Sequence, residues 1–292
     1  MSTLYLVATP IGNLEDIGMR AVRILQQVCL IAAEDTRQTA KLLHRYEIHT
    51  PSLSYHEHNK LVRLEQVLEA LKDGDVALVS DAGTPGLNDP GYELVRAAID
   101  AGHVVSSIPG PCAPIAALVA SGLPTDAFLY LGYLPRKCGD RHRQLQQVAC
   151  YPFTLIFLEV PHRLMPALED MKTELGDRQM AVGRELTKLH EEIYRGCISQ
   201  VIDHFTAAPP RGEFTLVVAG NTTKEQRWSE GRLNAELEKN IIKGLSTSQL
   251  AAQLAGQSGW SRREIYRYLI KRGENNLRTN ETGNNIIKGD NK

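Results

Sequence analysis

The sequence lacks the motifs that mark several common nucleotide-binding and hydrolytic folds. No GxGxxG follows its first apolar stretch, and no GxxxxGK followed by Ser or Thr occurs, so neither the common dinucleotide fold nor the P-loop is indicated. HExxH and GxSxG are also absent, which argues against a zinc-protease helix and an α/β-hydrolase nucleophile. His56 and His58 form an HxH pair without further clustered ligands, so we expect no metal site.

Cysteines and long apolar runs are also scarce. The cysteines are Cys29, Cys112, Cys138, Cys150 and Cys197. Their odd number, scatter and lack of CxxC spacing argue against a disulfide framework or a zinc ribbon, and fit a reducing cytosol. No apolar run approaches the ~20 residues of a membrane span, and the start MSTLYLVATPIGN lacks the basic residues of a signal peptide. We therefore expect a cytoplasmic protein with no membrane segment.

Charge is almost balanced over the whole chain but unevenly distributed. The 292 residues carry a formal net charge of −1. Residues 224–278 hold 11 Lys and Arg against 6 Asp and Glu, whereas the remainder holds 22 against 28. A basic C-terminal segment on an acidic body is the pattern expected if only one part contacts a polyanion, although a solvated helical face would give the same count.

Short apolar runs alternate with helical patterns along most of the chain. Strands are predicted at Leu4–Ala8, Leu30–Ala33, Val76–Ser80, Val104–Ile108, Phe128–Leu131, Thr154–Leu158, Met180–Gly183 and Phe214–Ala219. Helices are predicted at Arg20–Val28, Thr36–Tyr46, Leu61–Leu71, Glu93–Ala101, Pro114–Ala120 and Pro161–Leu175. This alternation indicates an α/β fold whose first half has largely parallel strands.

Stretches rich in Gly, Pro and polar residues divide the chain. One lies near residues 122–140 and another is NTTKEQRW, so we expect α/β domains at 1–121 and 122–223. A basic helical module follows at 232–275, and the Asn-rich segment 276–292 is predicted to be disordered.

The C-terminal module has two capping-box patterns, Ser246 with Gln249 and Ser261 with Glu264. GQSGW lies between the two predicted helices, so the module resembles a helix-turn-helix, with an ordinary helical hairpin as the alternative. Positive charge is concentrated on the second helix at Arg262, Arg263, Arg267 and Lys271, which we take as candidate RNA contacts.

Gly- and Pro-rich loops follow many of the predicted strands, among them TPIGNLEDIG, SDAGTPGLNDPG, PGPCAP, LGYLPR and EVPHR. In an open α/β sheet, ligands bind outside the carboxyl ends of the strands, so these loops predict a preformed pocket. Charged residues follow two further strands, in AEDTR and GRELTK. They are candidates for catalysis or for an ion-pair network that joins the two halves.

Six motifs occur in a fixed order: LYLVATPIGNLEDI, AEDTR, SDAGTPGLNDPG, IPGPCAP, EVPHR and GRELTK. Together they resemble the bacterial 16S ribosomal RNA (cytidine-2′-O)-methyltransferases, a family of the tetrapyrrole methylases, from about Leu4 to Trp228 and on through the C-terminal helices. The resemblance implies the two-domain tetrapyrrole-methylase fold with S-adenosylmethionine in the cleft between the domains. It also implies a homodimer and a cytidine ribose in the decoding region of 16S rRNA as the substrate, within the small ribosomal subunit.

The resemblance also supplies candidate cofactor contacts. The superfamily's Gly-Asp-Pro loop matches residues 83–85, where Thr84 replaces the acid, and its Pro-Gly-x-Ser-Ser loop matches residues 109–113, where both serines are absent. The implied cofactor residues are Pro10, Gly12, Asp81, Gly83, Thr84, Pro85, Leu87, Pro109, Gly110, Cys112, Ala113, Tyr133 and Pro161.

Methyl transfer to a ribose hydroxyl benefits from a base, because the free hydroxyl is a poor nucleophile. We expect Glu34 or Asp35 to accept or orient the hydroxyl proton, and Lys188, Arg37 and Arg184 to contact flanking phosphates or the alkoxide. Two rival interpretations stay open: a small-molecule tetrapyrrole methyltransferase, and a non-catalytic RNA-binding assembly factor.

Overall fold

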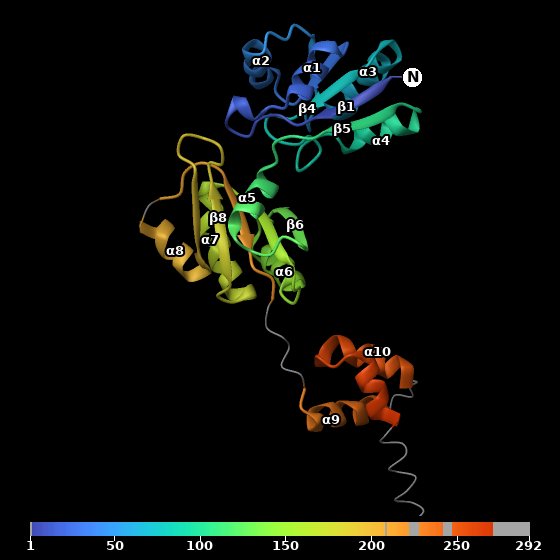
Figure 1. Ribbon diagram of the computed structural model, residues 1–292, viewed down its shortest axis with the longest axis vertical. Helices are drawn as coiled ribbons and strands as arrows, with labels where there is room; N and C mark the ends of the chain where they lie inside the picture. Colours follow the sequence, from blue (N-terminus) through green and yellow to red (C-terminus); the bar gives the residue numbers. More distant parts are fainter. Residues whose placement is uncertain (1, 208, 222–227, 242–246, 271–292) are drawn as a thin grey trace, which may run out of the picture. The chain divides into compact units, whose positions relative to one another are not determined.

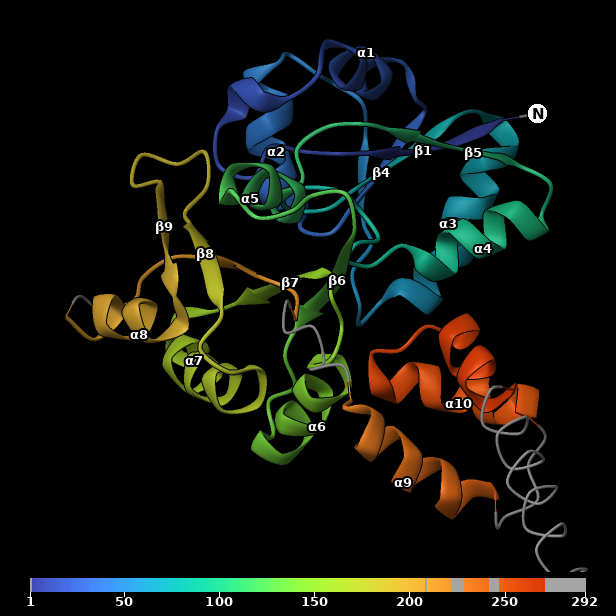
Figure 2. The same ribbon diagram turned by 60° about the horizontal axis from the view of Figure 1, so that its bottom comes forward.

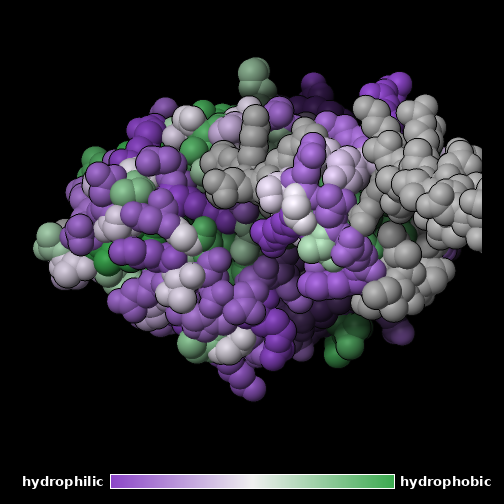
Figure 3. All heavy atoms as spheres, turned by 90° about the horizontal axis from the view of Figure 1, so that it is seen from below, coloured by the Kyte–Doolittle hydropathy of each residue, from purple (hydrophilic) through white to green (hydrophobic). Residues whose placement is uncertain are grey.

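The computed structural model describes residues 2–207, 209–221, 228–241 and 247–270. The chain divides into two compact units, residues 1–220 and 221–292, which we describe separately. Among the described residues, every helix is too short or too polar to cross a membrane. Hydrophilic residues predominate on the face drawn in Figure 3, where the coloured apolar residues are scattered.

The first unit begins with a parallel five-stranded sheet in the order β3-β2-β4-β1-β5. Its strands are β1 (Thr3–Val7), β2 (Leu30–Ala33), β3 (Ser52–Ser54), β4 (Val76–Val79) and β5 (Val104–Ile108). All four residues of the central strand β4 are buried, because helices cover both faces of the sheet. Parallel strands place their carboxyl ends at one edge, so the loops after β1, β2, β4 and β5 gather there.

Two helices cover each face of this first sheet (Figure 1). On one face, α1 (Met19–Gln27) and α2 (Thr36–Arg45) bury residues such as Leu25 and Leu42 against the strands. On the other face, α3 (Lys60–Asp73) and α4 (Tyr92–Asp100) bury Leu71 and Leu94. Their apolar residues recur at helical spacing, which is the pattern that predicted all four helices.

A second five-stranded sheet follows in the order β6-β7-β10-β8-β9. Its strands are β6 (Phe128–Tyr133), β7 (Thr154–Glu159), β8 (Gln179–Arg184), β9 (Glu192–Cys197) and β10 (Phe214–Val218). Only the β6–β7 pair is parallel. The helices α6 (Cys138–Val148), α7 (Pro161–Leu175) and α8 (Ile198–Ala207) cover one face, and α5 (Ala113–Ser121) covers the other (Figure 2).

The predicted fold class and all of the predicted strands are confirmed, and the described residues add β3, β9, α6, α8 and a short 3-10 helix at Leu14–Asp16. β3 has three residues, too few for a periodic pattern, and β9 is a half-buried edge strand without clean alternation. α6 is rich in charged and amide side chains. α5 precedes the domain boundary predicted at residue 121, yet Ala117 and Leu118 pack against the second sheet.

The second unit has its own apolar core. α9 (Glu230–Ile241), α10 (Thr247–Ser258) and the helical residues 262–270 bury Leu233, Leu254 and Ile265 against Trp260. The second capping box is confirmed: Ser261 N donates to Glu264 at 2.8 Å, and Glu264 N donates to the Ser261 hydroxyl at 3.3 Å. Ser246 of the first capping box, Lys271 and the segment 276–292 lie outside the described residues.

Candidate active site

A cavity of about 250 Å³ lies where the loops of the first sheet meet β6, β7 and β10, within the first unit. Its described lining residues are Ile11, Glu34, Asp81, Ala82, Gly83, Thr84, Leu87, Asn88, Asp89, Cys112, Ala113, Pro114, Tyr130, Tyr133, Leu158, Glu159, Glu213, Phe214 and Thr215. We call this space the acidic cavity. It occupies the strand-end position that the Gly- and Pro-rich loops predict.

Backbone hydrogen bonds join the loops on the first side of the acidic cavity. Thr9 N donates to Gly83 O at 2.8 Å, and Gly83 N donates back to Thr9 O at 3.0 Å. The Thr84 hydroxyl donates to Pro111 O at 3.3 Å, so the loops after β1, β4 and β5 are connected. Gly83 has φ +82°, a backbone conformation that residues other than glycine rarely adopt. This explains why a glycine occupies the turn.

On the second side, β6 contacts the loop after β4. The Tyr130 hydroxyl donates to Asn88 Oδ1 at 2.5 Å, and Asn88 has a left-handed backbone with φ 67°. Burial raises the pKa of both Tyr130 and Tyr133, so each phenol keeps its proton at neutral pH. Asparagine adopts a left-handed backbone more readily than most residues, so Asn88 can turn the loop after β4 toward β6 without a glycine.

The acidic cavity owes its name to five carboxylates in its lining: Glu34, Asp81, Asp89, Glu159 and Glu213. Among the described residues that line it, none is Lys, Arg or His. The Arg163 guanidinium lies 3.0 Å from Glu159 Oε1 and neutralises part of this charge. The remaining excess of negative charge favours a ligand that carries positive charge.

Glu34 and Asp89 are two carboxyls of the acidic cavity whose pKa is raised. Burial, with a smaller contribution from the nearby Asp81 charge, raises the pKa of Glu34. Burial and the Glu34 charge raise the pKa of Asp89 to about 6. Glu34 Oε2 also accepts a hydrogen bond from Asp81 N at 3.3 Å. A half-buried carboxyl with a raised pKa is a suitable proton acceptor near neutral pH.

Asp35, the second candidate base, has local partners instead. It is the N-cap residue of α2, where Oδ1 accepts from Arg37 N at 2.9 Å. The Arg37 guanidinium also donates to Oδ1 at 3.0 Å and to Oδ2 at 2.7 Å, and these hydrogen bonds hold the pKa of Asp35 down at about 2. Asp35 therefore stays ionised at neutral pH, and Arg37 is already engaged by its neighbour.

The GRELTK segment forms ion pairs, but their partners all lie in the second half of the first unit, so they are not the predicted network that joins the two halves. Lys188 Nζ lies 2.9 Å from Glu185 Oε1 and 3.0 Å from Glu213 Oε2. Arg184 Nη1 lies 3.0 Å from Glu192 Oε2, and its Nε donates to Arg211 O. A Cβ on Gly12 would come within 2.4 Å of Lys188 Cγ, so this glycine allows the first loop to approach the segment.

The predicted cofactor residues separate into two sets. Those that line the acidic cavity are Asp81, Gly83, Thr84, Leu87, Cys112, Ala113 and Tyr133. Those outside its lining are Pro10, Gly12, Pro85, Pro109, Gly110 and Pro161. Pro10 lines a neighbouring hollow that shares Asp81, and Pro161 is the first residue of α7. Gly110 is needed for close packing, because a Cβ there would meet Ala8 Cβ at 2.9 Å.

A second cavity, of about 960 Å³, shares Tyr133 with the acidic cavity. Its lining residues are Tyr133, Leu134, Pro135, Arg136, Arg141, Val160, His162, Arg163 and Pro166. We call it the basic cavity because its lining holds three arginines and a histidine but no carboxylate. Arg141 and Arg163 are paired with Asp170 and Glu159, whereas Arg136 is exposed.

Sequence reasoning missed Asp89, Glu159 and Glu213 as site residues, and it did not predict a separate basic cavity. Asp89 and Glu159 lie inside motifs that were recognised, NDPG and EVPHR, so their position at strand ends was an available signal. Most residues of the basic cavity lie in the LGYLPR and EVPHR loops, which were also recognised, but the sequence did not show that these loops form a second cavity with Arg141 of α6. In the second unit, Arg262, Arg263 and Arg267 are all exposed on the helical residues 262–270.

The tetrapyrrole (corrin/porphyrin) methylase family matches residues 3–202. Two relatives, both named ribosomal RNA small subunit methyltransferase I, resemble nearly the whole chain. The protein from Synechocystis sp. is 50% identical over 274 residues, covering 93% of this chain and 98% of its own. The protein from Bacillus subtilis is 45% identical over 272 residues, covering 91% and 93%.

Solved structures agree on the fold. A cobalamin biosynthetic enzyme, cobalt precorrin-4 methyltransferase, has a TM-score of 0.58 at 15% identity and covers 74% of this chain and 94% of its own. Uroporphyrin-III C-methyltransferase from Thermus thermophilus, complexed with S-adenyl homocysteine, has a TM-score of 0.53 at 17% identity, with coverages of 74% and 97%. The chain therefore belongs to the tetrapyrrole methylase family and is a methyltransferase of the branch that holds the ribosomal RNA small subunit methyltransferase I proteins.

Proposed function

We propose that this protein transfers a methyl group from S-adenosylmethionine to the 2′-hydroxyl of a cytidine ribose in the decoding region of 16S ribosomal RNA. The observation that carries the proposal is a cavity with five carboxylates among converging loops, in a chain 50% identical to a relative named ribosomal RNA small subunit methyltransferase I. The protein would work in the cytoplasm on the small ribosomal subunit, as a homodimer.

The acidic cavity fits S-adenosylmethionine by charge. The cofactor carries a sulfonium and an ammonium against one carboxylate, so its net charge is positive. When bound, it supplies an electrophilic methyl group. Asp81, Asp89 and Glu159 provide the complementary negative charge, and the backbone of the loops at residues 81–89 and 109–113 provides donors and acceptors. The two tyrosines, Tyr130 and Tyr133, offer rings against which a purine could stack.

Glu34 is the residue to which we assign proton acceptance. It lines the acidic cavity, its carboxyl has a raised pKa, and only Asp81 N donates to it among its described hydrogen bonds. An ionised Glu34 can accept the proton of a ribose hydroxyl placed beside it, which makes that oxygen a better nucleophile. Asp35 is assigned an orienting role instead, because its backbone N–H donates to Asp81 Oδ1 at 2.9 Å.

The basic cavity is the place we assign to RNA phosphates. RNA presents a negative backbone that the acidic cavity would repel, so a neighbouring cation-lined surface is needed. Arg136 is exposed at this cavity, which shares Tyr133 with the acidic cavity. Arg37, Arg184 and Lys188 keep their proposed role at the RNA, but each would first have to leave a carboxylate partner.

The C-terminal unit is proposed as a second RNA-binding surface. Its exposed arginines, Arg262, Arg263 and Arg267, lie on one short helical stretch, and an independent apolar core supports that stretch. A rigid cationic helix can track a phosphate backbone without reading bases. Lys271, the last predicted contact, lies outside the described residues.

The rival tetrapyrrole substrate is less well supported by the cavities. A flat macrocycle favours a large apolar cleft, whereas the acidic cavity is about 250 Å³ and lined by five carboxylates. The neighbouring basic cavity is larger, and its lining combines apolar side chains with three arginines and a histidine.

The function is tested by methyl transfer from tritiated S-adenosylmethionine to small ribosomal subunits, with free 16S RNA and a porphyrinoid mixture in parallel. We expect label in RNA, at a single ribose whose 3′ phosphodiester resists alkaline cleavage. Label in the porphyrinoid alone would move the protein to the small-molecule branch. Label in neither substrate would favour a non-catalytic binding factor.

A further inference from the structure

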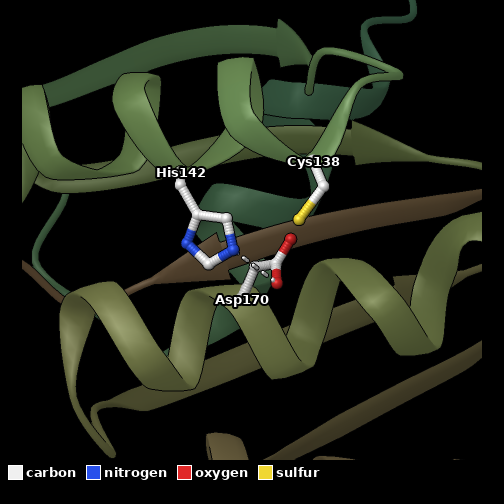
Figure 4. Close-up of side chains that lie close together, drawn as sticks. All are labelled: Cys138, His142 and Asp170. Carbon is white, nitrogen blue, oxygen red and sulfur yellow. Dashed lines mark ion pairs between the residues drawn. The ribbon is translucent and has the colours of Figure 1, made fainter.

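Cys138, His142 and Asp170 form a cluster on the outer helices of the second sheet, away from the residues that line the acidic cavity. Cys138 and His142 lie one turn apart on α6, and Asp170 faces them from α7 (Figure 4). Their ligand atoms all lie within 4.8 Å of one another. Sequence spacing alone could not reveal this cluster, because its third member follows 28 residues after His142 and on another helix.

The two nitrogens of His142 have different partners. Nδ1 lies 2.7 Å from Glu174 Oε1, and Nε2 lies 3.2 Å from Asp170 Oδ1. The imidazole therefore lies between two carboxylates, with Nε2 on the side of Asp170. A ring nitrogen whose opposite nitrogen is held by a carboxylate is the arrangement commonly found for histidine ligands of metal ions.

Asp170 and Cys138 complete the set of donors. The second oxygen of Asp170, Oδ2, accepts a hydrogen bond from Arg141 Nε, which leaves Oδ1 turned toward His142. Cys138 is the first residue of α6, and its side chain is exposed, so an ion from solvent can reach the thiol. Glu174 behind the imidazole and Arg141 behind the carboxylate are the kind of partners that orient metal ligands in known sites.

We propose that Cys138 Sγ, His142 Nε2 and Asp170 Oδ1 bind a zinc ion. Sulfur, imidazole nitrogen and carboxylate oxygen are all ordinary zinc ligands, and three protein ligands leave one tetrahedral position for water. Bonds of about 2.0–2.3 Å place one sulfur and two lighter tetrahedral ligands roughly 3.3–3.6 Å apart, so the three atoms, now within 4.8 Å of one another, need to approach by up to about 1.5 Å. The ion would link α6 to α7, whose residues Leu145 and Met171 share one apolar core.

The test uses the full-length chain without a histidine tag, stripped with EDTA and then titrated with Zn²⁺. Co²⁺ serves as the spectroscopic probe, because a thiolate–cobalt charge-transfer band reports sulfur ligation. We expect about one zinc per chain and a zinc-dependent rise in melting temperature. The charge-transfer band should be present in the wild type and in Cys150→Ser, since Cys150 is also exposed, and absent in Cys138→Ser.

A second variant separates zinc binding from a simple ion-pair cluster. Glu174→Gln keeps the size of the side chain behind His142 but removes its charge, and it should weaken zinc binding about 10- to 100-fold. Cys138 is exposed, so circular dichroism of the metal-free Cys138→Ser variant should match the wild type. A wild-type chain that binds no zinc at micromolar concentrations would overturn the proposal. Equal zinc affinity in wild type and Cys138→Ser would overturn it as well.

Discussion

The acidic and basic cavities share Tyr133 but have opposite charge. The acidic cavity gathers Glu34, Asp81 and Asp89 from strand ends of the first sheet, whereas the basic cavity gathers Arg136 and Arg163 from around α6 and α7. A methyl donor with net positive charge and an RNA with a negative backbone cannot both be attracted to one surface of single sign. This difference is the reason for our proposal that the cofactor binds in the acidic cavity and the RNA at the basic cavity.

The largest effect is expected from removing the base in the acidic cavity. Glu34→Gln should lower the single-turnover methylation rate of small subunits by about 100-fold or more, because a positioned base contributes that much to hydroxyl attack. Binding of S-adenosylmethionine should change little. Asp35→Asn, which preserves the N-cap of α2, is the matched control with a smaller effect. Equal rates in wild type and Glu34→Gln would remove Glu34 from the mechanism.

Removing the C-terminal unit should weaken RNA binding and leave cofactor binding unchanged. A chain ending at Gly220, where the first compact unit ends, should keep its affinity for S-adenosylmethionine. Its affinity for RNA should fall roughly tenfold or more, and the dependence of log K on log salt should become shallower, since fewer counterions are released. Filter binding at several salt concentrations measures both quantities. Identical salt slopes with and without the unit would contradict its role.

The charge of Asp89 gives a pH-dependent prediction. Its pKa is about 6 in the folded chain, above the ordinary 3.8. As the pH rises from 3.8 to about 6, the unfolded chain loses this proton before the folded chain does, so the free energy of unfolding falls. Asp89→Asn removes the ionisable group and should therefore not destabilise the protein at neutral pH. As the pH falls through about 6, the acidic cavity loses this negative charge, and affinity for S-adenosylmethionine should weaken.

Calorimetric titration from pH 5 to pH 8 tests this behaviour. Asp89→Asn should bind about tenfold more weakly at pH 8, as expected for the loss of one nearby charge, and its affinity should be nearly flat with pH. Asp126→Asn, an exposed aspartate outside the acidic cavity, is the control. An unchanged pH profile in Asp89→Asn would mean that another group titrates.

The smallest effect is expected at the basic cavity. Arg136→Ala should weaken RNA binding several-fold and reduce the salt slope by about one, without changing affinity for the cofactor. Arg143→Ala is the control, because Arg143 is an exposed arginine on α6 that lies outside the basic cavity and pairs with Asp140. Equal losses of RNA affinity in the two variants would mean that the basic cavity contributes to RNA binding only as any exposed positive charge does.

Features that depend on a short stretch of sequence could be predicted. The apolar runs of β1, β4 and β5 and the loops behind them predicted the first sheet and the position of the acidic cavity, because parallel strands bring their carboxyl ends together. The charged motifs were harder to interpret. Asp35 and Arg37 bind each other two residues apart, so a pair that suggested catalysis also has a plain capping role.

The way in which distant segments come together could not be predicted from the sequence. The basic cavity and the cluster of Cys138, His142 and Asp170 both depend on how α6 packs beside α7. The polar sequence of α6 buries only Arg141, Leu145 and Val148, so its helical period was too weak to predict the element at all. The absence of clustered ligands in the sequence therefore did not exclude a cluster in space.

The separation of cofactor and RNA is tested most directly by hydrogen–deuterium exchange of the full chain with each ligand in turn. S-adenosylmethionine should protect backbone amides at residues 81–89, 109–113 and 130–133, which line or adjoin the acidic cavity. A ribosomal RNA fragment should instead protect residues 134–141 and 160–166, around the basic cavity. Protection of residues 134–141 by the cofactor, with residues 81–89 left unchanged, would contradict the account.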